Sequence, residues 1–176
     1  MKPTLIKDVY ELNIKKFEDS RGYFQSIFKK QEETGKIWGD RSIKQVNLSN
    51  NYEKGTIRGL HYQKEPLSEC KLITCISGSI WDVAVDLRRD SLTYGKYTSC
   101  KLTKDLSNAL LIPEGCAHGF QCLEASSQLL YIHSEKWDKN AESGIRWDDP
   151  CLNINWPLPP FNISTKDLNL PFFQRI

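Results

Sequence analysis

The sequence predicts an all-β protein in which many short antiparallel strands form a sandwich or a barrel. Short apolar runs recur along the chain, with Gly, Pro and other turn-forming residues between them. In the run 79–87 one predicted face carries Trp81, Val83, Val85 and Leu87, and the other carries Asp82, Ala84 and Asp86. Helical periodicity is scarce, so a parallel fold with alternating helices is not expected.

The elements follow from these signals in order. The segments 10–28 and 44–51 predict strands and loops, and 26–36 predicts a short helix with Gly35 near its end. One helical turn is expected at 103–107. The clearest predicted strands are 71–76, 79–87, 108–113, 118–123 and 128–134. Five prolines after Asp149 predict a C-terminal segment that wraps over the barrel without regular structure.

Length and charge narrow the class of protein. At 176 residues the chain is expected to form one domain, residues 1–176, with a proper core. The net charge of +2 does not indicate a nucleic-acid-binding surface. No signal-peptide pattern and no apolar run of about 18 residues is present, so we expect a cytoplasmic protein without a membrane span. A small anionic ligand is compatible with this composition.

The six cysteines show no metal-binding spacing. No C-x-x-C pair occurs, and four of the six lie in apolar or strand-like runs. We therefore expect reduced thiols, mostly in the core, and no metal cluster built from them.

Three charged or titratable residues stand in a segment that otherwise resembles a sheet core. Arg58 and His61 belong to RGLHYQ, and Lys71 begins the next strand. Charge is disfavoured in a strand core unless it is solvated or paired. A small barrel with an open mouth can hold one ligand, so these side chains are expected to point into a wet pocket.

A second histidine segment, IPEGCAHGF, contains the pattern P-x-G-x-x-H ending at His118. This pattern resembles the second motif of the cupins, whose fold is a jelly roll, also called a double-stranded β-helix barrel. The first cupin motif usually supplies H-x-H and a glutamate as metal ligands, whereas His61 stands alone here. Two histidines make a poor transition-metal site, so no bound metal and no cofactor are expected.

The remaining chemistry is proton transfer. Histidine is a good general base near neutral pH, and Tyr131 lies in a predicted strand where it could act as an acid. Lys71 and Arg58 could stabilise an enolate oxygen. These residues suit proton abstraction next to a carbonyl. On the residues alone, a buried structural His61 and a core Tyr131 remain open alternatives.

Ten segments in the same order resemble the dTDP-4-dehydrorhamnose 3,5-epimerase family, and together they cover nearly the whole chain. They are DSRGYF (19–24), KQVNLS (44–49), GTIRGLHYQ (55–63), KLITCISGSIWDVAVDLR (71–88), SLTYGK (91–96), IPEGCAHGFQ (112–121), LLYIHSEKW (129–137), ESGIRWDDP (142–150), INWP (154–157) and STKDLNLP (164–171). The resemblance implies a cupin-type jelly roll with short peripheral helices, a metal-free homodimer, and epimerisation of a dTDP-linked 4-keto-6-deoxy sugar at C3 and C5.

The resemblance also implies roles for individual residues. His61 would be the base, Asp167 would hold its ring and increase its basicity, and Tyr131 would be the acid on the opposite face. Lys71 and Arg58 would face the enolate oxygen. The implied ligand-contacting residues are Arg21 (on the diphosphate, across the dimer interface), Gln45, Asn47, Arg58, His118, Trp137, Glu142 and Lys166.

Two positions depart from the family pattern. Ser26 stands where RGxFxE would place a glutamate that helps to bind the nucleotide, and Trp137 replaces a usual tyrosine. An indole still stacks on a pyrimidine base. These changes leave nucleotide preference open.

Other functions remain as alternatives. A mono-epimerase acting at C3 or C5 shares the same catalytic pair. A ketoisomerase would carry a further histidine where Tyr62 and Gln63 stand. A non-catalytic sugar-nucleotide-binding protein and a metal-dependent cupin oxygenase belong to other classes, and turnover and metal content respectively would distinguish them.

Overall fold

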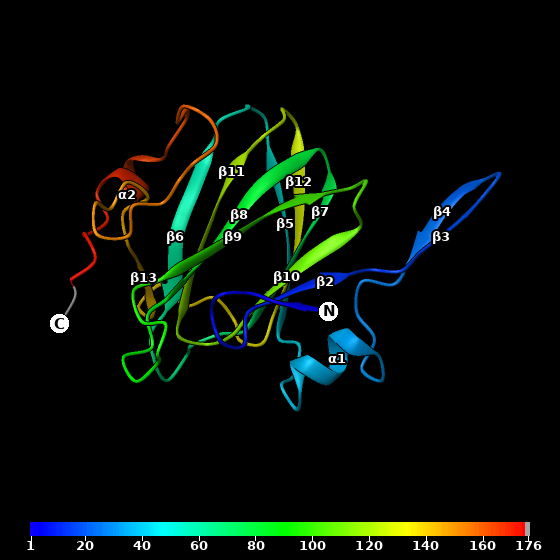
Figure 1. Cartoon of the computed structure of the whole chain (residues 1–176), viewed down its shortest axis with the longest axis horizontal. Coiled ribbons are helices and arrows are strands. Elements are labelled where there is room, and N and C mark those ends of the chain that lie inside the picture. The colour runs from blue at the N-terminus through cyan, green and yellow to red at the C-terminus, as the bar shows by residue number, and fades with distance from the viewer. Residues whose placement is uncertain (175–176) are drawn as a thin grey trace.

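The computed structural model describes residues 1–174 and places two antiparallel β-sheets face to face (Figure 1). The six-stranded sheet has the order β1-β2-β10-β7-β12-β5, and the five-stranded sheet has the order β13-β6-β11-β8-β9. From β6 to β13 consecutive strands lie in different sheets, except β8 and β9, which pair with each other in the five-stranded sheet; this two-sheet arrangement is that of the predicted jelly roll. The all-β prediction is therefore confirmed.

The bounds of the elements are as follows. The strands are β1 (Lys2–Pro3), β2 (Tyr10–Asn13), β3 (Lys16–Asp19), β4 (Gly22–Gln25), β5 (Gln45–Asn51), β6 (Ile57–Gln63), β7 (Lys71–Ser77), β8 (Ser79–Asp86), β9 (Tyr97–Thr103), β10 (Asn108–Ile112), β11 (Cys116–Cys122), β12 (Ser127–His133) and β13 (Glu142–Gly144). The helices are α1 (Glu33–Trp38) and α2 (Thr165–Leu168).

The core lies between the two sheets. Ile73, Leu110 and Leu129 of the six-stranded sheet pack against Ile80 and Phe120 of the five-stranded sheet, and all are essentially inaccessible to water. Burying such side chains contributes about 1.5–3 kcal/mol each, which is the main force that holds the sheets together.

Both outer faces are also covered, which explains why the strands are apolar on both sides. Trp38 of α1 packs on Leu72 and Leu111, on the outside of the six-stranded sheet. The chain after β13 covers the outside of the five-stranded sheet, where Leu152 joins Val83 and other residues in a third cluster. The predicted wrapping of the C-terminal segment is confirmed.

Two predicted helical segments need correction. The helix expected at 26–36 begins at Glu33 and ends at Trp38, so Gly35 lies inside it and Gly39 caps it with a positive φ of 67°. The segment before Glu33 is irregular. The C-terminal segment contains one regular element, α2, which begins after Ser164 because the Ser164 hydroxyl accepts a hydrogen bond from the backbone N–H of Asp167.

One pair of glycines allows β6 and β11 to approach closely. Gly59 has a φ of 116°, and a Cβ atom there would lie 2.6 Å from the Cα of Gly119. Side chains at these two positions would push the strands apart. The pairing matters because β6 and β11 carry His61 and His118, which stand directly opposite each other in the register.

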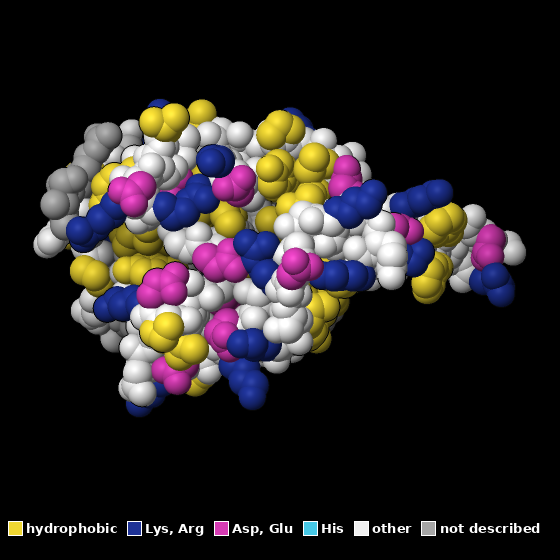
Figure 2. All heavy atoms as spheres, turned by 90° about the horizontal axis from the view of Figure 1, so that it is seen from below, with side chains coloured by type: hydrophobic (Ala, Val, Ile, Leu, Met, Phe, Trp, Pro, Cys, Tyr) yellow, Lys and Arg dark blue, Asp and Glu magenta, His cyan; other side chains and the backbone are white. Residues whose placement is uncertain are grey.

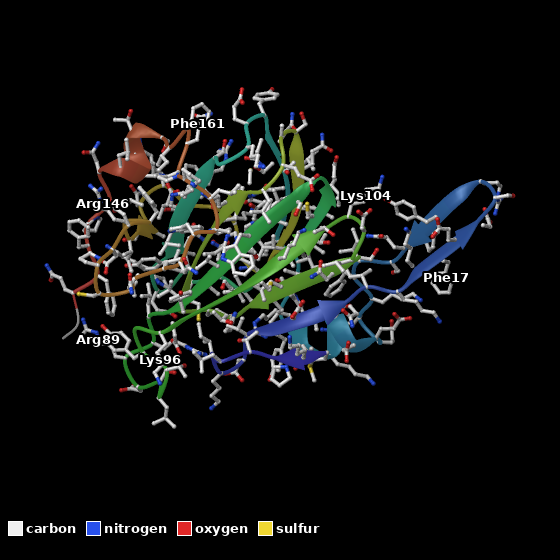
Figure 3. All side chains as sticks on the ribbon, turned by 45° about the horizontal axis from the view of Figure 1, so that its top comes forward. Phe17, Arg89, Lys96, Lys104, Arg146 and Phe161 are labelled. Carbon is white, nitrogen blue, oxygen red and sulfur yellow. The ribbon has the colours of Figure 1, made fainter. Side chains whose placement is uncertain are left out.

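The β3–β4 hairpin projects away from the sheets, and we call residues 16–25 the arm (Figure 1). Figure 3 shows Phe17 on the arm at one end of the molecule, with Arg146 and Phe161 at the other end, near α2. No helix among the described residues is long and apolar enough to cross a membrane. Each of the six cysteines is a free thiol; four are buried, Cys100 is partly buried and Cys151 is exposed.

Candidate active site

A cavity of about 920 Å³ opens between the two sheets and gathers most of the predicted site residues. Its walls include eleven of the twelve: Gln45, Asn47, Arg58, His61, Lys71, His118, Tyr131, Trp137, Glu142, Lys166 and Asp167. Arg21 is the exception. It lies at the turn of the arm, 88% exposed, and pairs with Asp19 at 2.7 Å.

His61 and Asp167 form a hydrogen-bonded pair. His61 extends from β6 with its side chain 31% exposed, and its Nε2 lies 2.7 Å from Oδ1 of the buried Asp167 on α2. The second carboxylate oxygen, Oδ2, accepts a hydrogen bond of 3.1 Å from the backbone N–H of Gly59. The short helix α2 therefore has a clear function, since it brings a carboxylate to the strand that carries the histidine.

The Asp167 carboxyl is ionised in this setting. Burial raises its pKa, but the hydrogen bonds from His61, Gly59 and Ser164 outweigh burial, so the net pKa is lowered. An ionised carboxylate only accepts hydrogen bonds, so the proton on the imidazole lies on Nε2. The lone pair of Nδ1 is then available as a base.

Tyr131 extends into the same cavity from the opposite sheet. It lies on β12 of the six-stranded sheet, whereas His61 lies on β6 of the five-stranded sheet. Burial and the negative charge of Asp82 raise the pKa of the Tyr131 hydroxyl well above 10, although Arg58 acts in the other direction. The phenol therefore keeps its proton at neutral pH and can donate it to a bound molecule.

His118 forms a second histidine–aspartate pair at the floor of the cavity. Its Nε2 lies 2.7 Å from Oδ1 of Asp82, whose side chain is completely buried on β8. The ring of His118 meets Tyr131 edge to face, with the ring centres 5.9 Å apart. His118 thus supports Tyr131 from the side of the five-stranded sheet.

Two cations line the same cavity as the predicted base and acid. Lys71, at the start of β7, is 7% exposed and lies 3.0 Å from Oε1 of Glu69. Arg58 on β6 donates from Nε to Oδ1 of Asn51 at 2.8 Å, which orients the guanidinium. Both carry hydrogen-bond donors and positive charge of the kind that stabilises a developing oxyanion.

The rim of the cavity carries the predicted nucleotide-binding residues. Trp137 is 55% exposed, and its backbone N–H donates to Oε1 of Gln45 at 2.8 Å. Nζ of Lys166 lies 2.6 Å from Oε1 of Glu142, so these two residues pair with each other across the rim. Ser26, the departure noted in the sequence, follows β4 and is not among the residues that line the cavity.

Sequence reasoning missed three residues of this site: Asp82, Glu69 and His133. Asp82 lies two residues from Ala84 on β8, and His133 lies two residues from Tyr131 on β12, whereas Glu69 lies two residues before Lys71, the first residue of β7. A period of two places such residues on the same face. Among residues 1–174, no group of three or more His, Cys, Asp or Glu side chains is arranged to hold a metal ion.

The chain is similar to proteins of known activity over nearly its whole length. The family model described as dTDP-4-dehydrorhamnose 3,5-epimerase matches residues 3–175. A protein of that name from Shigella flexneri is 39% identical over 166 residues, which are 94% of this chain and 91% of the relative.

Solved structures agree with this family match. The dTDP-4-dehydrorhamnose 3,5-epimerase of Bacillus anthracis, with TDP and PPi bound, superposes with a TM-score of 0.92 at 37% identity and covers 97% of both chains. The Legionella pneumophila enzyme, in complex with dTDP-4-keto-L-rhamnose, gives a TM-score of 0.90 at 31% identity and covers 99% of this chain and 98% of its own.

Proposed function

The chain belongs to the dTDP-4-dehydrorhamnose 3,5-epimerase family, and we propose that it converts dTDP-4-dehydro-6-deoxy-D-glucose to dTDP-4-dehydro-L-rhamnose. The enzyme is an isomerase of this type, and it acts by removing and returning protons at C3 and C5. One observation carries the proposal. The His61–Asp167 pair and the Tyr131 hydroxyl extend into one cavity from opposite sheets, so a sugar ring between them meets a base on one face and an acid on the other.

The reaction proceeds through an enolate. Nδ1 of His61 removes the proton from a carbon next to the C4 ketone, and the electrons of that C–H bond move to the ketone oxygen. Lys71 and Arg58 stabilise the resulting negative charge. The Asp167 carboxylate stabilises the imidazolium that forms, without taking its proton.

Inversion results when the proton returns from the other face. The Tyr131 hydroxyl donates its proton to the carbon, and the enolate collapses to the ketone. The enzyme then resets, because the imidazolium loses a proton to water and the phenolate regains one. Since C3 and C5 both flank C4, a second round at the other carbon completes the double epimerisation. Protons from the solvent therefore enter the product.

The rim residues suit the nucleotide diphosphate. Trp137 offers an exposed indole for stacking on the base, and Gln45 and Asn47 offer amide groups to the phosphates. Lys166 adds a positive charge that Glu142 holds in place in the free protein. The similar Bacillus anthracis protein holds TDP and PPi, which supports a thymidine diphosphate as the ligand here.

We also propose a homodimer in which the arm of one subunit reaches the cavity of the other. Tyr23 and Phe24 on the arm are 42% and 70% exposed, and Val46 and Leu48 are exposed on the outer face of the edge strand β5. Figure 2 shows hydrophobic side chains gathered along the arm. The arm and α2 lie at opposite ends of the molecule, so Arg21 is far from its own Asp167 (Figure 1). In a dimer its guanidinium would bind the diphosphate of the partner's ligand.

A cytoplasmic location is the last part of the proposal. Its support is that four of the six cysteines are buried free thiols, which is typical of proteins that work in a reducing compartment.

Solvent deuterium incorporation tests the proposed reaction. The purified protein is incubated with dTDP-4-keto-6-deoxyglucose in heavy water, and the sugar protons are followed by NMR. Label at both C3 and C5 is expected. Label at a single carbon would instead indicate a mono-epimerase, and no label would refute turnover of this substrate. The His61→Asn variant should incorporate no label, and retained incorporation would refute His61 as the base.

A further inference from the structure

The third histidine of the chain, His133, has no role in the proposed reaction, yet it lines the same cavity. It is the last residue of β12, and its Cα lies directly opposite those of Gln45 on β5 and Lys71 on β7. These three side chains therefore form one row across the six-stranded sheet and point to the same face. The row joins a residue at the nucleotide end of the cavity to a residue at the sugar end.

Glu69 connects His133 to Lys71. Its Oε2 lies 2.7 Å from Nδ1 of His133, and its Oε1 lies 3.0 Å from Nζ of Lys71. All three residues are at most 9% exposed. Burial raises the pKa of Glu69, but the hydrogen bond from His133 and the charge of Lys71 outweigh it and lower the pKa overall. Glu69 is thus an ionised acceptor for both neighbours.

The other side of His133 leads to the rim. Its Nε2 lies 3.3 Å from Nδ2 of Asn47, and Oδ1 of Asn47 accepts from Nε2 of Gln45 at 2.9 Å. Oε1 of Gln45 in turn accepts from the backbone N–H of Trp137. We call this series the hydrogen-bond chain; its members are Trp137, Gln45, Asn47, His133, Glu69 and Lys71.

The direction of every bond in the hydrogen-bond chain is set at its two ends. A backbone N–H can only donate, so Gln45 must turn its oxygen to Trp137 and its NH₂ to Asn47. Asn47 must then turn its NH₂ to His133, whose Nε2 has to accept. At the other end the Glu69 carboxylate can only accept, so Nδ1 of His133 must carry the proton. Both ends demand the same state of His133: a neutral ring protonated on Nδ1.

We propose that His133 and Glu69 are positioning residues that hold Lys71 at the reacting sugar and Gln45, Asn47 and Trp137 at the nucleotide in one ordered hydrogen-bond chain. This inference rests on the proposed function for the identity of the ligand. Glu69 fixes the ammonium of Lys71 near the ketone, and Nζ of Lys71 also lies 3.4 Å from the carbonyl oxygen of His61. His133 donates from Nδ1 to Glu69 and accepts at Nε2 from Asn47, so it links Glu69 to the amides at the rim.

Two substitutions separate the two halves of the chain. In His133→Asn the side-chain NH₂ can still donate to Glu69, but the acceptor for Asn47 is lost. The Lys71 half stays in place, so kcat should stay within about threefold of the wild type while the affinity for dTDP falls about tenfold. In Glu69→Gln the amide oxygen can accept from only one neighbour: if it serves His133, Lys71 is released and kcat should fall at least about tenfold, and if it serves Lys71, the NH₂ faces His133 and the proton must leave Nδ1. Glu124→Gln, on an exposed loop, is the matched control and should behave like the wild type.

The tautomer of His133 can be measured directly, and a purely structural role for this residue would not require one particular tautomer. In the ¹⁵N spectrum of the free wild-type protein, we expect a protonated Nδ1 and an unprotonated Nε2 for the ring that disappears in His133→Asn. Glu69→Gln should either move this proton to Nε2 or lower kcat at least about tenfold. A wild-type ring protonated on Nε2, or a Glu69→Gln variant with an unchanged tautomer and unchanged kcat, would overturn the inference. If the wild type does not turn over the keto sugar, the proposed function fails, whereas the tautomer and the dTDP titration still test the chain.

Discussion

Replacing Asp167 by asparagine tests the base most directly, because the change keeps the shape of the side chain and removes one charge. The Asp167 carboxylate accepts from Nε2 of His61 and from the backbone N–H of Gly59. An amide can accept only one of these bonds. If its oxygen serves Gly59, its NH₂ faces Nε2 and the imidazole proton is forced onto Nδ1, where the base should be. If its oxygen serves His61, the Gly59 N–H is left without a partner.

The size of the effect follows from the charge pair that forms during proton abstraction. Two unit charges about 4 Å apart attract by about 4 kcal/mol at an effective dielectric constant of about 20. The His61 side chain is 31% exposed, and solvent screening reduces this to about 2–3 kcal/mol. We therefore expect kcat to fall about 30- to 150-fold.

The assay is the rate of deuterium incorporation at C3 and C5 under saturating substrate, followed by NMR. Asp105→Asn, in the exposed turn between β9 and β10, is the matched control and should leave the rate unchanged. A thermal melt of each variant shows whether it is folded. A folded Asp167→Asn protein that exchanges within about threefold of the wild type would refute the role of the carboxylate, because such a rate corresponds to less than about 1 kcal/mol.

Three further predictions concern the acid, the stability and the assembly. Tyr131→Phe should still exchange label through His61 but form the epimer at least about 100-fold more slowly; an unaltered epimerisation rate in NMR of the products would refute Tyr131 as the acid. Asp86 is completely buried, and although burial raises its pKa, hydrogen bonds from Arg88, Ser91 and Thr93 lower it to about 2. At pH values above 3.8, the pKa of this group in the unfolded chain, the ionised carboxylate thus stabilises the fold by about 2 kcal/mol. This stability is lost as the pH falls from about 4 towards 2, and urea titrations of Asp86→Asn at pH 7 should show its absence. Phe24→Asp should yield monomers in light scattering, and a persistent dimer would argue against contact through the arm.

The sequence was sufficient to predict the sheets because its strands have simple patterns. The run 79–87 alternates cleanly between two faces, and the structure keeps this separation: Ala84 lies in the core between the sheets, and Val83 and Val85 lie in the outer cluster. The helix α1 was misplaced because its limits depend on packing: Trp38 is buried against the six-stranded sheet, and that contact decides where the helix ends. Tertiary burial thus outweighed the local signal of Gly35.

Most residues of the candidate site were predicted from the sequence, and the ones that were missed depend on the tertiary arrangement. Family resemblance identified His61, Tyr131 and Asp167, and the structure brings all three to one cavity. The strand period places His133 on the face of Tyr131, but its alignment with Gln45 and Lys71 depends on strand register, and the position of Glu69 depends on the turn before β7; no local motif encodes either. The position of Arg21 on the arm shows a further limit, since the contact proposed for it lies on another subunit and no pattern within one chain describes that geometry.

The configuration of the product is the measurement that tests the central claim most directly. The protein is incubated with dTDP-4-keto-6-deoxyglucose, the ketone is reduced with borohydride, and the sugars are released and identified by chiral chromatography. Inversion at both C3 and C5 predicts L-rhamnose together with its C4 epimer, 6-deoxy-L-talose. Recovery of D-series sugars alone, or of sugars inverted at a single carbon, would contradict the account of His61 and Tyr131 acting from opposite faces at both positions.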